Sequence, residues 1–346
     1  MKNLYNFNYQ QIQDEMLNLN MKAYRGKQIF RWLYRGMATS IDDMSDISKD
    51  ARAQLKESYT IETLETIKIQ VSNDGTRKYL FKLADGCLVE SVLMRFDYGN
   101  SVCVSSQVGC NMGCRFCASG LLKKNRDLSS AEMVQQVMAV QADIKDQRVS
   151  HVVVMGTGEP FDNYNNVMNF LNIINDDNGM AIGARHITIS TCGIVPKIIE
   201  FAQGKYQYNL AISLHAAYDE LRTRLMPINN AYPLRELMRA LDVYESLNNR
   251  RLTFEYILLK DVNDSRRDAE KLAKLLRNKN YYINLIPYNS VDEKDFRNVS
   301  KSEALIFYDI LCKMNVRCTI RKEHGADIDA ACGQLRAKEL LNKRGE

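Results

Sequence analysis

The chain has 346 residues, of which 45% are hydrophobic, and its 47 basic and 42 acidic residues give a net charge of +5. This composition excludes an intrinsically disordered chain and allows one large domain with a small accessory one. The N-terminus lacks the apolar core of a secretory signal, and no apolar run of about 18 residues predicts a membrane span. We therefore expect a cytoplasmic protein without a membrane partner.

Residues 1–62 are predicted to form a helical accessory domain that binds RNA. Its segment 22–35 contains five basic residues and no acidic ones, with aromatic residues between them. The basic residues are Lys22, Arg25, Lys27, Arg31 and Arg35, and the aromatic ones are Tyr24, Phe30, Trp32 and Tyr34. Such a segment is typical of a nucleic-acid contact or of a solvated helix face, and composition leaves both open. Arg115, Lys123, Lys124 and Arg126 are further candidates for RNA contact.

Residues 63–98 alternate between apolar and polar side chains and contain two Asp-Gly turns, which predicts an antiparallel β meander linking the domains. Glu90 shares a strand face with Leu88, Val92 and Met94. Burial there would favour the neutral carboxyl and raise its pKa, so that Glu90 could act as a general base. The alternative is an edge-strand charge that reaches water.

Residues 99–325 alternate between β-rich runs and amphipathic helical stretches, which is typical of a mostly parallel sheet. We expect an α/β fold, a partial (β/α)6 barrel. Its six strands are expected at Val102–Ser106, Val152–Met155, Ile187–Thr191, Leu210–Leu214, Leu252–Leu258 and Ile283–Ile286. The run Ser129 to Glu132 predicts the capping box of a helix.

Cys110, Cys114 and Cys117 follow the first of these strands at C-x3-C-x2-C spacing. Three thiolates on one loop can hold three corners of a 4Fe–4S cluster and leave the fourth iron without a protein ligand. A structural zinc site is the alternative, but it normally needs a fourth ligand, and no second cysteine pair follows. Buried core cysteines would show an apolar periodicity that this loop lacks.

Polar motifs follow the other predicted strands at their carboxyl ends, where ligand sites form in βα architectures. They are Gly156–Pro160, Ser190 and Thr191, Ser213 to His215, and Pro287 to Asn289. Each motif alone is typical of a turn or a cap, and His215 alone of a hydrogen-bonded core histidine. Because all these motifs follow their strands at the same, carboxyl end, together they favour a ligand pocket.

The cysteine loop followed by Gly158-Glu159-Pro160 resembles the radical S-adenosylmethionine (SAM) superfamily. Three further segments, 103–107, 213–216 and 327–335, make the chain similar to the RlmN family of RNA adenine C2-methyltransferases. The resemblance covers about Tyr24 to Glu339. It implies that Cys110, Cys114 and Cys117 bind a 4Fe–4S cluster and that SAM chelates the open iron. It also implies a SAM pocket lined by Gly158, Glu159, Ser190, Ser213, Leu214, His215 and Asn289.

The resemblance further implies a mechanism that uses two SAM molecules per turnover. Adenine carbon 2 is electron-poor and cannot attack the methyl group of SAM, so the methyl group is first placed on Cys332, in the C-terminal tail 326–346. A deoxyadenosyl radical from the second SAM takes a hydrogen atom from that methyl group, and the carbon radical adds to the adenine. Glu90 then removes the proton of the substrate carbon, and Cys103 releases the product by forming a disulfide with Cys332. From position alone, Cys103 could equally be a core residue.

The implied substrates are an adenine in the peptidyl-transferase region of 23S rRNA and the adenine 3′ of a tRNA anticodon. The implied electron donor is a flavodoxin or a ferredoxin, and we expect a monomer. Two residues depart from the family pattern: Cys192, where serine is common, and Asp127, where asparagine is usual.

Two other functions remain possible at this stage. The Cfr type methylates carbon 8 and confers antibiotic resistance, but Pro160 stands where those chains usually have alanine. An RNA-binding iron–sulfur protein without catalysis would not need Cys332, Cys103 and the Gly-Glu pair together.

Overall fold

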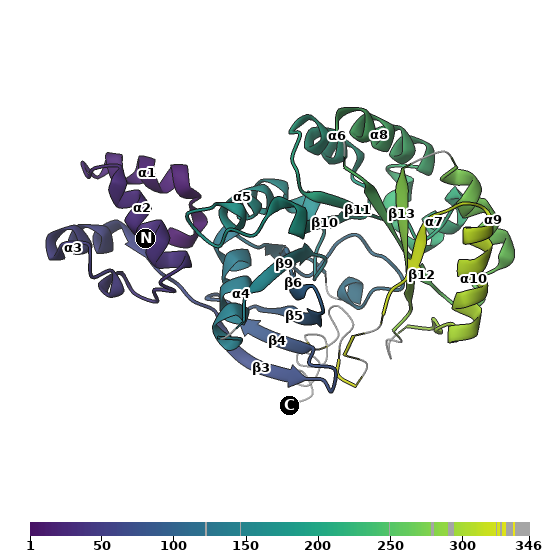
Figure 1. Cartoon of the computed structure of the whole chain (residues 1–346), viewed down its shortest axis with the longest axis horizontal. Helices are drawn as coiled ribbons and strands as arrows, with labels where there is room; N and C mark the ends of the chain where they lie inside the picture. The colour runs from purple at the N-terminus through teal and green to yellow at the C-terminus, as the bar shows by residue number, and fades with distance from the viewer. Residues whose placement is uncertain are drawn as a thin grey trace.

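The protein is described by a computed structural model that covers residues 1–121, 123–145, 147–248, 250–277, 280–289, 294–322, 324–325, 327–329 and 335. A helical lobe at the N-terminal end lies beside the helices that cover the outer side of a large curved sheet (Figure 1). No helix among these residues is long and apolar enough to cross a membrane.

The N-terminal lobe comprises three α-helices, two short 3-10 helices (η1 and η2) and two short paired strands. They are β1 (Lys2–Asn3), η1 (Leu4–Asn6), α1 (Tyr9–Asn18), α2 (Tyr24–Tyr34), η2 (Ile41–Asp43), α3 (Lys49–Ser58) and β2 (Tyr59–Thr60). Ile29, Leu33 and Phe30 belong to its fully buried core. Asn6 and Asn8 connect the lobe to the barrel helices through hydrogen bonds with Ala131 and Asn169.

The basic segment of α2 exposes only some of the aromatic side chains that its composition suggested for stacking on nucleic-acid bases. Phe30 and Tyr34 are buried in the lobe, and the Trp32 indole donates a hydrogen bond to Asp46. Tyr24 is 52% exposed, with the Arg25 guanidinium over its ring. The helical period therefore directs two of the four aromatic residues inward and leaves Tyr24 as the exposed one.

Within the described part of the chain, the central sheet has ten strands in the order β14-β13-β12-β11-β10-β9-β6-β5-β4-β3. The antiparallel part comprises β3 (Glu65–Val71), β4 (Arg77–Lys82) and β5 (Leu88–Phe96), and β5 pairs antiparallel with β6 (Gly99–Val104). From β6 onward the strands are parallel: β9 (Val149–Val154), β10 (Ile187–Thr191), β11 (Asn209–Ser213), β12 (Leu252–Leu258), β13 (Tyr281–Pro287) and β14 (Cys318–Ile320). The predicted meander thus continues the barrel sheet.

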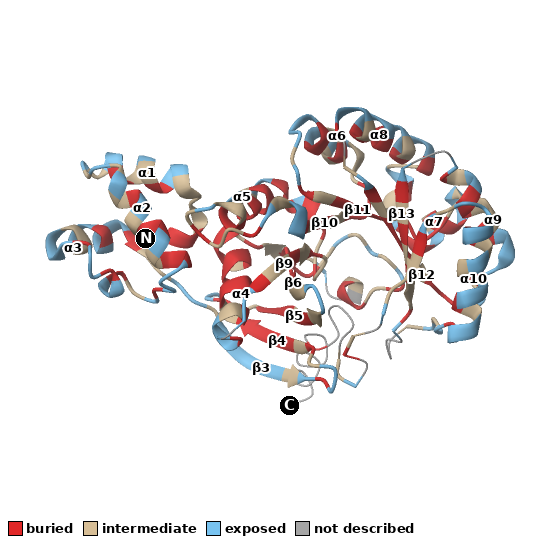
Figure 2. Cartoon of the chain, viewed as in Figure 1, coloured by how far each residue is buried: buried red, intermediate tan, exposed pale blue. Residues whose placement is uncertain are grey.

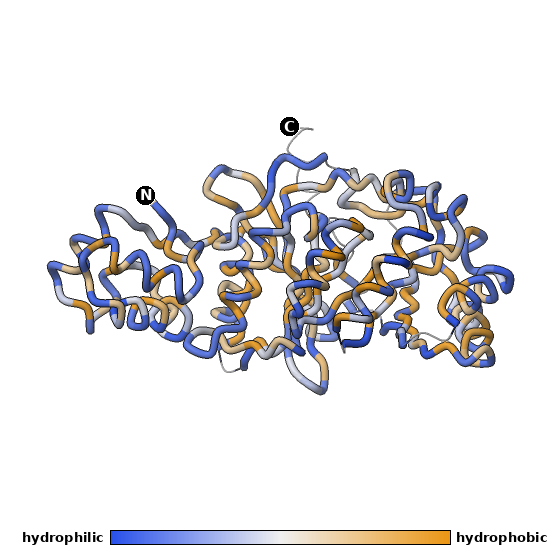
Figure 3. Tube along the Cα trace, turned by 90° about the horizontal axis from the view of Figure 1, so that it is seen from above, coloured by the Kyte–Doolittle hydropathy of each residue, from blue (hydrophilic) through white to orange (hydrophobic). Residues whose placement is uncertain are grey.

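Among the described residues, seven α-helices lie between the parallel strands. They are α4 (Ser130–Asp143), α5 (Tyr164–Asn175), α6 (Val195–Gln203), α7 (Asp219–Leu225), α8 (Leu234–Leu247), α9 (Arg266–Leu275) and α10 (Lys301–Lys313). Six of them pack on the outer face of the sheet, whereas α7 clusters with Phe116 of the cysteine loop through Leu221 and Leu225. Buried residues line the sheet sides of these helices, and β3 is largely exposed (Figure 2). Viewed from above, hydrophobic residues run through the interior of the barrel (Figure 3).

The predicted partial (β/α) barrel is confirmed, and so are its six parallel strands and the capping box at Ser129 and Glu132. The count of parallel strands was one too low, because β14 was missed. Its three residues are too few to show a β period, and only their pairing with β13 identifies them as a strand.

Candidate active site

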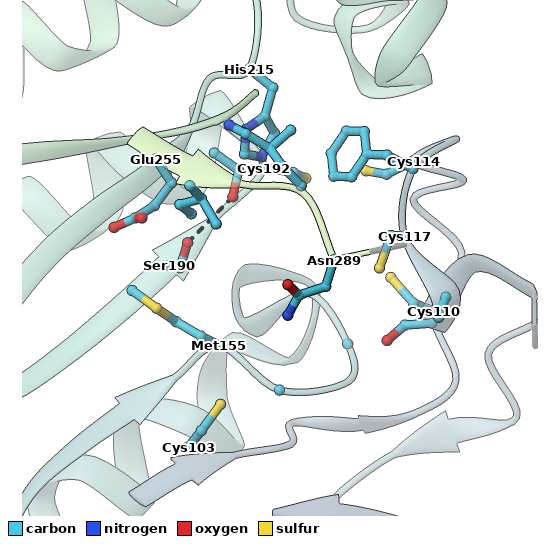
Figure 4. A pocket seen from close by; sticks show the side chains of 18 of the residues that line it. Cys103, Cys110, Cys114, Cys117, Met155, Ser190, Cys192, His215, Glu255 and Asn289 are labelled. Carbon is cyan, nitrogen blue, oxygen red and sulfur yellow. Dashed lines mark hydrogen bonds between the residues drawn. The ribbon is translucent and has the colours of Figure 1, made fainter. Parts of the chain in front are cut away.

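A cavity of about 370 Å³ opens at the carboxyl ends of the parallel strands. Of the catalytic, cluster-binding and SAM-binding residues that the resemblance implies, those that line it are Cys103, Cys110, Cys114, Cys117, Gly158, Glu159, Ser190, Ser213, His215 and Asn289. The three loop cysteines lie together at one end, and Cys103 approaches from strand β6 (Figure 4). Side chains from at least six different segments of the chain therefore face one space.

The cysteine loop is closed at its base by two short strands. β7 (Gln107–Val108) pairs antiparallel with β8 (Arg126–Asp127), so the chain between them projects as a loop. The Arg115 N–H donates to the Leu225 carbonyl at 2.9 Å and fixes the loop against α7. The loop is therefore held at both its base and its tip.

The three loop thiols have the chemistry of metal ligands. Burial raises the pKa of Cys110 to about 11, and burial next to Cys117 and Cys110 raises the pKa of Cys114 further. Thiolates in such a place require a compensating cation, which a metal centre provides. The buried Arg222 guanidinium favours negative charge at Cys114. Three half-buried thiols on one loop fit the open-cornered cluster that their spacing predicted.

Gly158 and Glu159 follow β9 in a turn that presses against the segment after β6. Gly158 has φ of +115°, and a Cβ atom there would lie 2.7 Å from the Gln107 Cβ and from the Ser106 Oγ. The Glu159 carboxylate accepts hydrogen bonds from the N–H groups of Phe161 at 3.0 Å and Cys192 at 2.8 Å. Burial raises the pKa of Glu159. Only glycine fits at 158, and Glu159 is held rigidly at the cavity wall.

Cys192, whose backbone N–H donates the hydrogen bond to Glu159, is one of the two residues that depart from the family pattern. Its thiol is buried, lines the same cavity, and has a raised pKa because of burial.

Ser190, Ser213 and His215 present polar groups from neighbouring strands. The hydroxyl oxygens of Ser190 and Ser213 lie 3.4 Å apart. His215 has a left-handed φ of +56°, and its Nδ1 accepts a hydrogen bond from the Ile257 N–H at 3.0 Å. Burial next to Arg222 lowers the pKa of His215 to about 3, so the imidazole is neutral at physiological pH. Leu214 differs from its predicted placement, because its side chain packs in the hydrophobic core and does not line the cavity.

Several cavity residues were missed by the sequence reasoning. Glu255 on β12 is buried, its pKa is raised by burial, and no hydrogen-bond partner among the described residues reaches its Oε2. Arg321, Lys322 and His324 approach from the segment after β14. Glu255 could have been suspected as an acid inside an apolar strand, but only the strand register places it level with Ser213.

Glu90 lies beside this cavity, outside the residues that line it, whereas its neighbours Val92 and Met94 line it. It is 4% exposed on a strand between β4 and β6, so the edge-strand alternative is excluded. Its Oε2 lies 3.0 Å from the Nζ of Lys78, whose side chain is fully buried. Sequence reasoning missed Lys78, because two residues on different strands meet only through the register of β4 with β5.

The remaining predicted residues divide into two groups. Cys332 lies outside the described residues, and with it the predicted meeting of Cys332 and Cys103. Two of the basic candidates near the cysteine loop form ion pairs: Lys124 with Asp127 and Asp162, and Arg126 with Asp85 and Glu132. These two side chains stabilise the loop base, and Asp127 does not add an uncompensated negative charge.

Comparisons with known proteins agree with this geometry. The protein-family model described as "Radical SAM superfamily" matches residues 104–276. The family model described as "Ribosomal RNA large subunit methyltransferase N-terminal domain" matches residues 2–61. A "Probable dual-specificity RNA methyltransferase RlmN" from Enterococcus faecalis is 54% identical over 99% of this chain and 98% of its own length. The corresponding protein of Oceanobacillus iheyensis is 51% identical, with the same coverage. A solved radical SAM methyltransferase from Sphaerobacter thermophilus superposes with a TM-score of 0.92 at 40% identity, covering 96% of this chain and 99% of that one.

Proposed function

The chain belongs to the RlmN family of radical SAM RNA methyltransferases, and from this premise we propose that it methylates carbon 2 of an adenine in 23S rRNA and in tRNA. The observation that carries the proposal is that the cysteine loop, Glu159 and the second thiol Cys103 line one cavity. A binding protein would need the loop cysteines alone.

Cys110, Cys114 and Cys117 would hold the cluster, which supplies the electron that cleaves SAM. Glu159 is suited to bind the SAM amino group, because a buried carboxylate fixed by two backbone N–H groups attracts an ammonium ion. Ser190 and Ser213 offer hydroxyl groups, and Asn289 an amide, to the polar parts of the same molecule. His215, neutral and held by Ile257, would orient a hydrogen bond without adding charge.

Cys332 would accept a methyl group from one SAM by ordinary displacement and carry it to the base. Cys103 would later attack the sulfur of Cys332, forming a disulfide as the carbon leaves, and a thiol reductant must then regenerate both thiols. Glu90 would take the proton of the substrate carbon. Its burial supports this role, since a general base has to be shielded from bulk water, and Val92 and Met94 of the same strand line the cavity.

The alternative product is the carbon 8 methyl derivative. Both reactions would use the same cluster and thiols, and Pro160 remains the residue that favours carbon 2. The rRNA and tRNA sites and a flavodoxin or ferredoxin donor are part of this proposal.

The experiment compares the wild type with C332A and C312A, each reconstituted with iron and sulfide without oxygen. Cys312 is an exposed thiol that does not line the cavity, so C312A is the matched control. We expect C332A to lose methylation of unmodified 23S rRNA while it still binds that RNA, and C312A to keep both. Retained methylation by C332A would overturn the carrier mechanism.

A further inference from the structure

Two cysteines outside the cavity lie side by side where α10 meets the edge of the central sheet. Cys312 is in the last turn of α10, and Cys318 is the first residue of β14. Their sulfur atoms are 3.9 Å apart, and both thiols are free. Neither side chain lines the cavity. The pair is therefore separate from the thiols that the proposed reaction uses.

The backbone between the two cysteines holds them close to each other. Asn315 has a left-handed φ of +62°, which ends α10 as in a Schellman motif. The Val316 N–H donates to the Leu311 carbonyl at 3.0 Å. The Asn315 N–H donates to the Cys312 carbonyl, also at 3.0 Å. These bonds fix the direction in which the chain leaves the helix, so the backbone itself sets the distance between the two thiols.

The two thiols differ in their access to solvent. Cys318 pairs with Ile283 of β13, whose N–H donates to the Arg317 carbonyl at 3.0 Å. Cys318 is 8% exposed and belongs to the hydrophobic core, whereas Cys312 is exposed. Burial and the neighbouring Cys312 thiol raise the pKa of Cys318. A dissolved oxidant therefore meets Cys312 first, because the reactivity of a thiol follows its exposure and its thiolate character.

We propose that Cys312 and Cys318 form a reversible disulfide by exchange with a small-molecule disulfide such as oxidised glutathione. The Cys312 thiolate attacks one glutathione sulfur, and the first glutathione leaves as a thiolate. The Cys318 thiolate then attacks the Cys312 sulfur of this mixed disulfide and expels the second glutathione. The two protein thiols lose two electrons and two protons, and two glutathione thiols gain them.

The geometry favours the second step over accumulation of the mixed disulfide. A disulfide has a sulfur–sulfur distance of about 2.05 Å, so the two sulfur atoms must approach by about 2 Å. Rotation of the exposed Cys312 side chain to another staggered position moves its sulfur by a comparable distance. The turn already holds Cys318 beside it, which makes the attack intramolecular and gives it the advantage of proximity. Once Cys312 carries glutathione it has no negative charge, and its contribution to the raised pKa of Cys318 is lost.

The disulfide ties the edge of the sheet to α10. β14 has three residues and is the last strand of the ten-stranded sheet, next to β13. Arg321 and Lys322, which follow it, line the cavity. A short edge strand opens more easily than the interior of a sheet, and a covalent link to a packed helix opposes that opening. We therefore expect slower amide hydrogen exchange in residues 318–321 of the oxidised protein.

The test maps the disulfide by peptide analysis. The protein, reconstituted with iron and sulfide without oxygen, is equilibrated in glutathione buffers from reduced to oxidised, quenched in acid and alkylated. Trypsin cleaves after Lys313 and after Arg317. Peptides 302–313 and 318–321 therefore stay joined only through a disulfide. We expect the joined peptide to replace the two alkylated peptides in oxidised buffer and to disappear after reduction with dithiothreitol.

Two variants separate the steps. We expect C318S to accumulate a glutathione adduct on Cys312, and C312S to keep the buried Cys318 as a free thiol. In the wild type, a glutathione adduct that persists on Cys312 without the joined peptide would overturn the proposal, because Cys318 then does not complete the exchange. Two free thiols in the most oxidised buffer would also overturn it. Unchanged hydrogen exchange in residues 318–321 of the joined form would contradict the restraint on β14. The wild-type peptide map needs neither variant, so it decides the question even if one of them fails to fold.

Discussion

Replacing Lys78 with methionine is expected to destabilise the protein strongly. The Lys78 ammonium group and the Glu90 carboxylate are 3.0 Å apart, and both side chains are buried. At an effective dielectric constant of about 20, Coulomb's law gives roughly 5–6 kcal/mol for this separation. Removing one partner leaves the other charge buried without it, which typically costs about 3–5 kcal/mol. We therefore expect K78M to lower the free energy of unfolding by about that amount.

Strand β4 supplies a matched control for this prediction. Lys82 lies 3.0 Å from Glu65, but these side chains are 46% and 62% exposed. An exposed pair contributes at most about 1 kcal/mol, so K82M should be nearly neutral. Urea denaturation of each variant measures the free energy of unfolding. If K78M costs no more than K82M, burial does not govern the strength of this ion pair, and the reasoning fails.

Three further predictions concern the cavity wall. G158A should lose SAM binding, because its Cβ would lie 2.7 Å from two neighbouring atoms, whereas G183A, with no atom within 4 Å, should bind as the wild type in equilibrium dialysis. R222M should lower the free energy of unfolding by about 3 kcal/mol in urea, because the Cys192 carbonyl and the Asn229 amide oxygen lose their donor inside the protein, and R222K should lose less. His215 has a pKa lowered to about 3, so the unfolded chain binds more protons than the folded one between about pH 6.5 and 3. On acidification through this window, the free energy of unfolding of the wild type should therefore fall by up to about 1.4 kcal/mol per pH unit more than that of H215N. Urea denaturation at a series of pH values measures both. Equal losses in the two proteins would refute the assignment.

Local patterns account for the parts of the site that the sequence predicted. The cysteine loop, Gly158 and Glu159 follow strands directly, and the carboxyl ends of parallel strands meet at one edge of a sheet. Leu214 was assigned to the SAM pocket by the family resemblance, and the structure places its side chain in the core, because successive residues along a strand direction point to opposite faces.

Contacts between distant segments could not be predicted in this way. Lys78 meets Glu90 through strand register, and Arg222 reaches the cavity wall from α7. The Ser72 hydroxyl donates a hydrogen bond to Asp327, which is 255 positions away in the sequence. Local sequence patterns do not indicate contacts between residues so far apart. The aromatic residues of α2 alternate with basic residues in the sequence, but the helix buries Phe30 and Tyr34. Alternation in the sequence therefore does not predict which side chains of a helix are exposed.

The most direct test of the central claim is the identity of the nucleoside that the protein makes. Protein reconstituted with iron and sulfide is incubated without oxygen with SAM, a reductant and unmodified 23S rRNA or tRNA, and the digested RNA is analysed by mass spectrometry against 2-methyladenosine and 8-methyladenosine standards. The account predicts 2-methyladenosine. Only 8-methyladenosine would contradict the assigned carbon, and no methylated adenosine in either RNA would contradict the enzyme assignment.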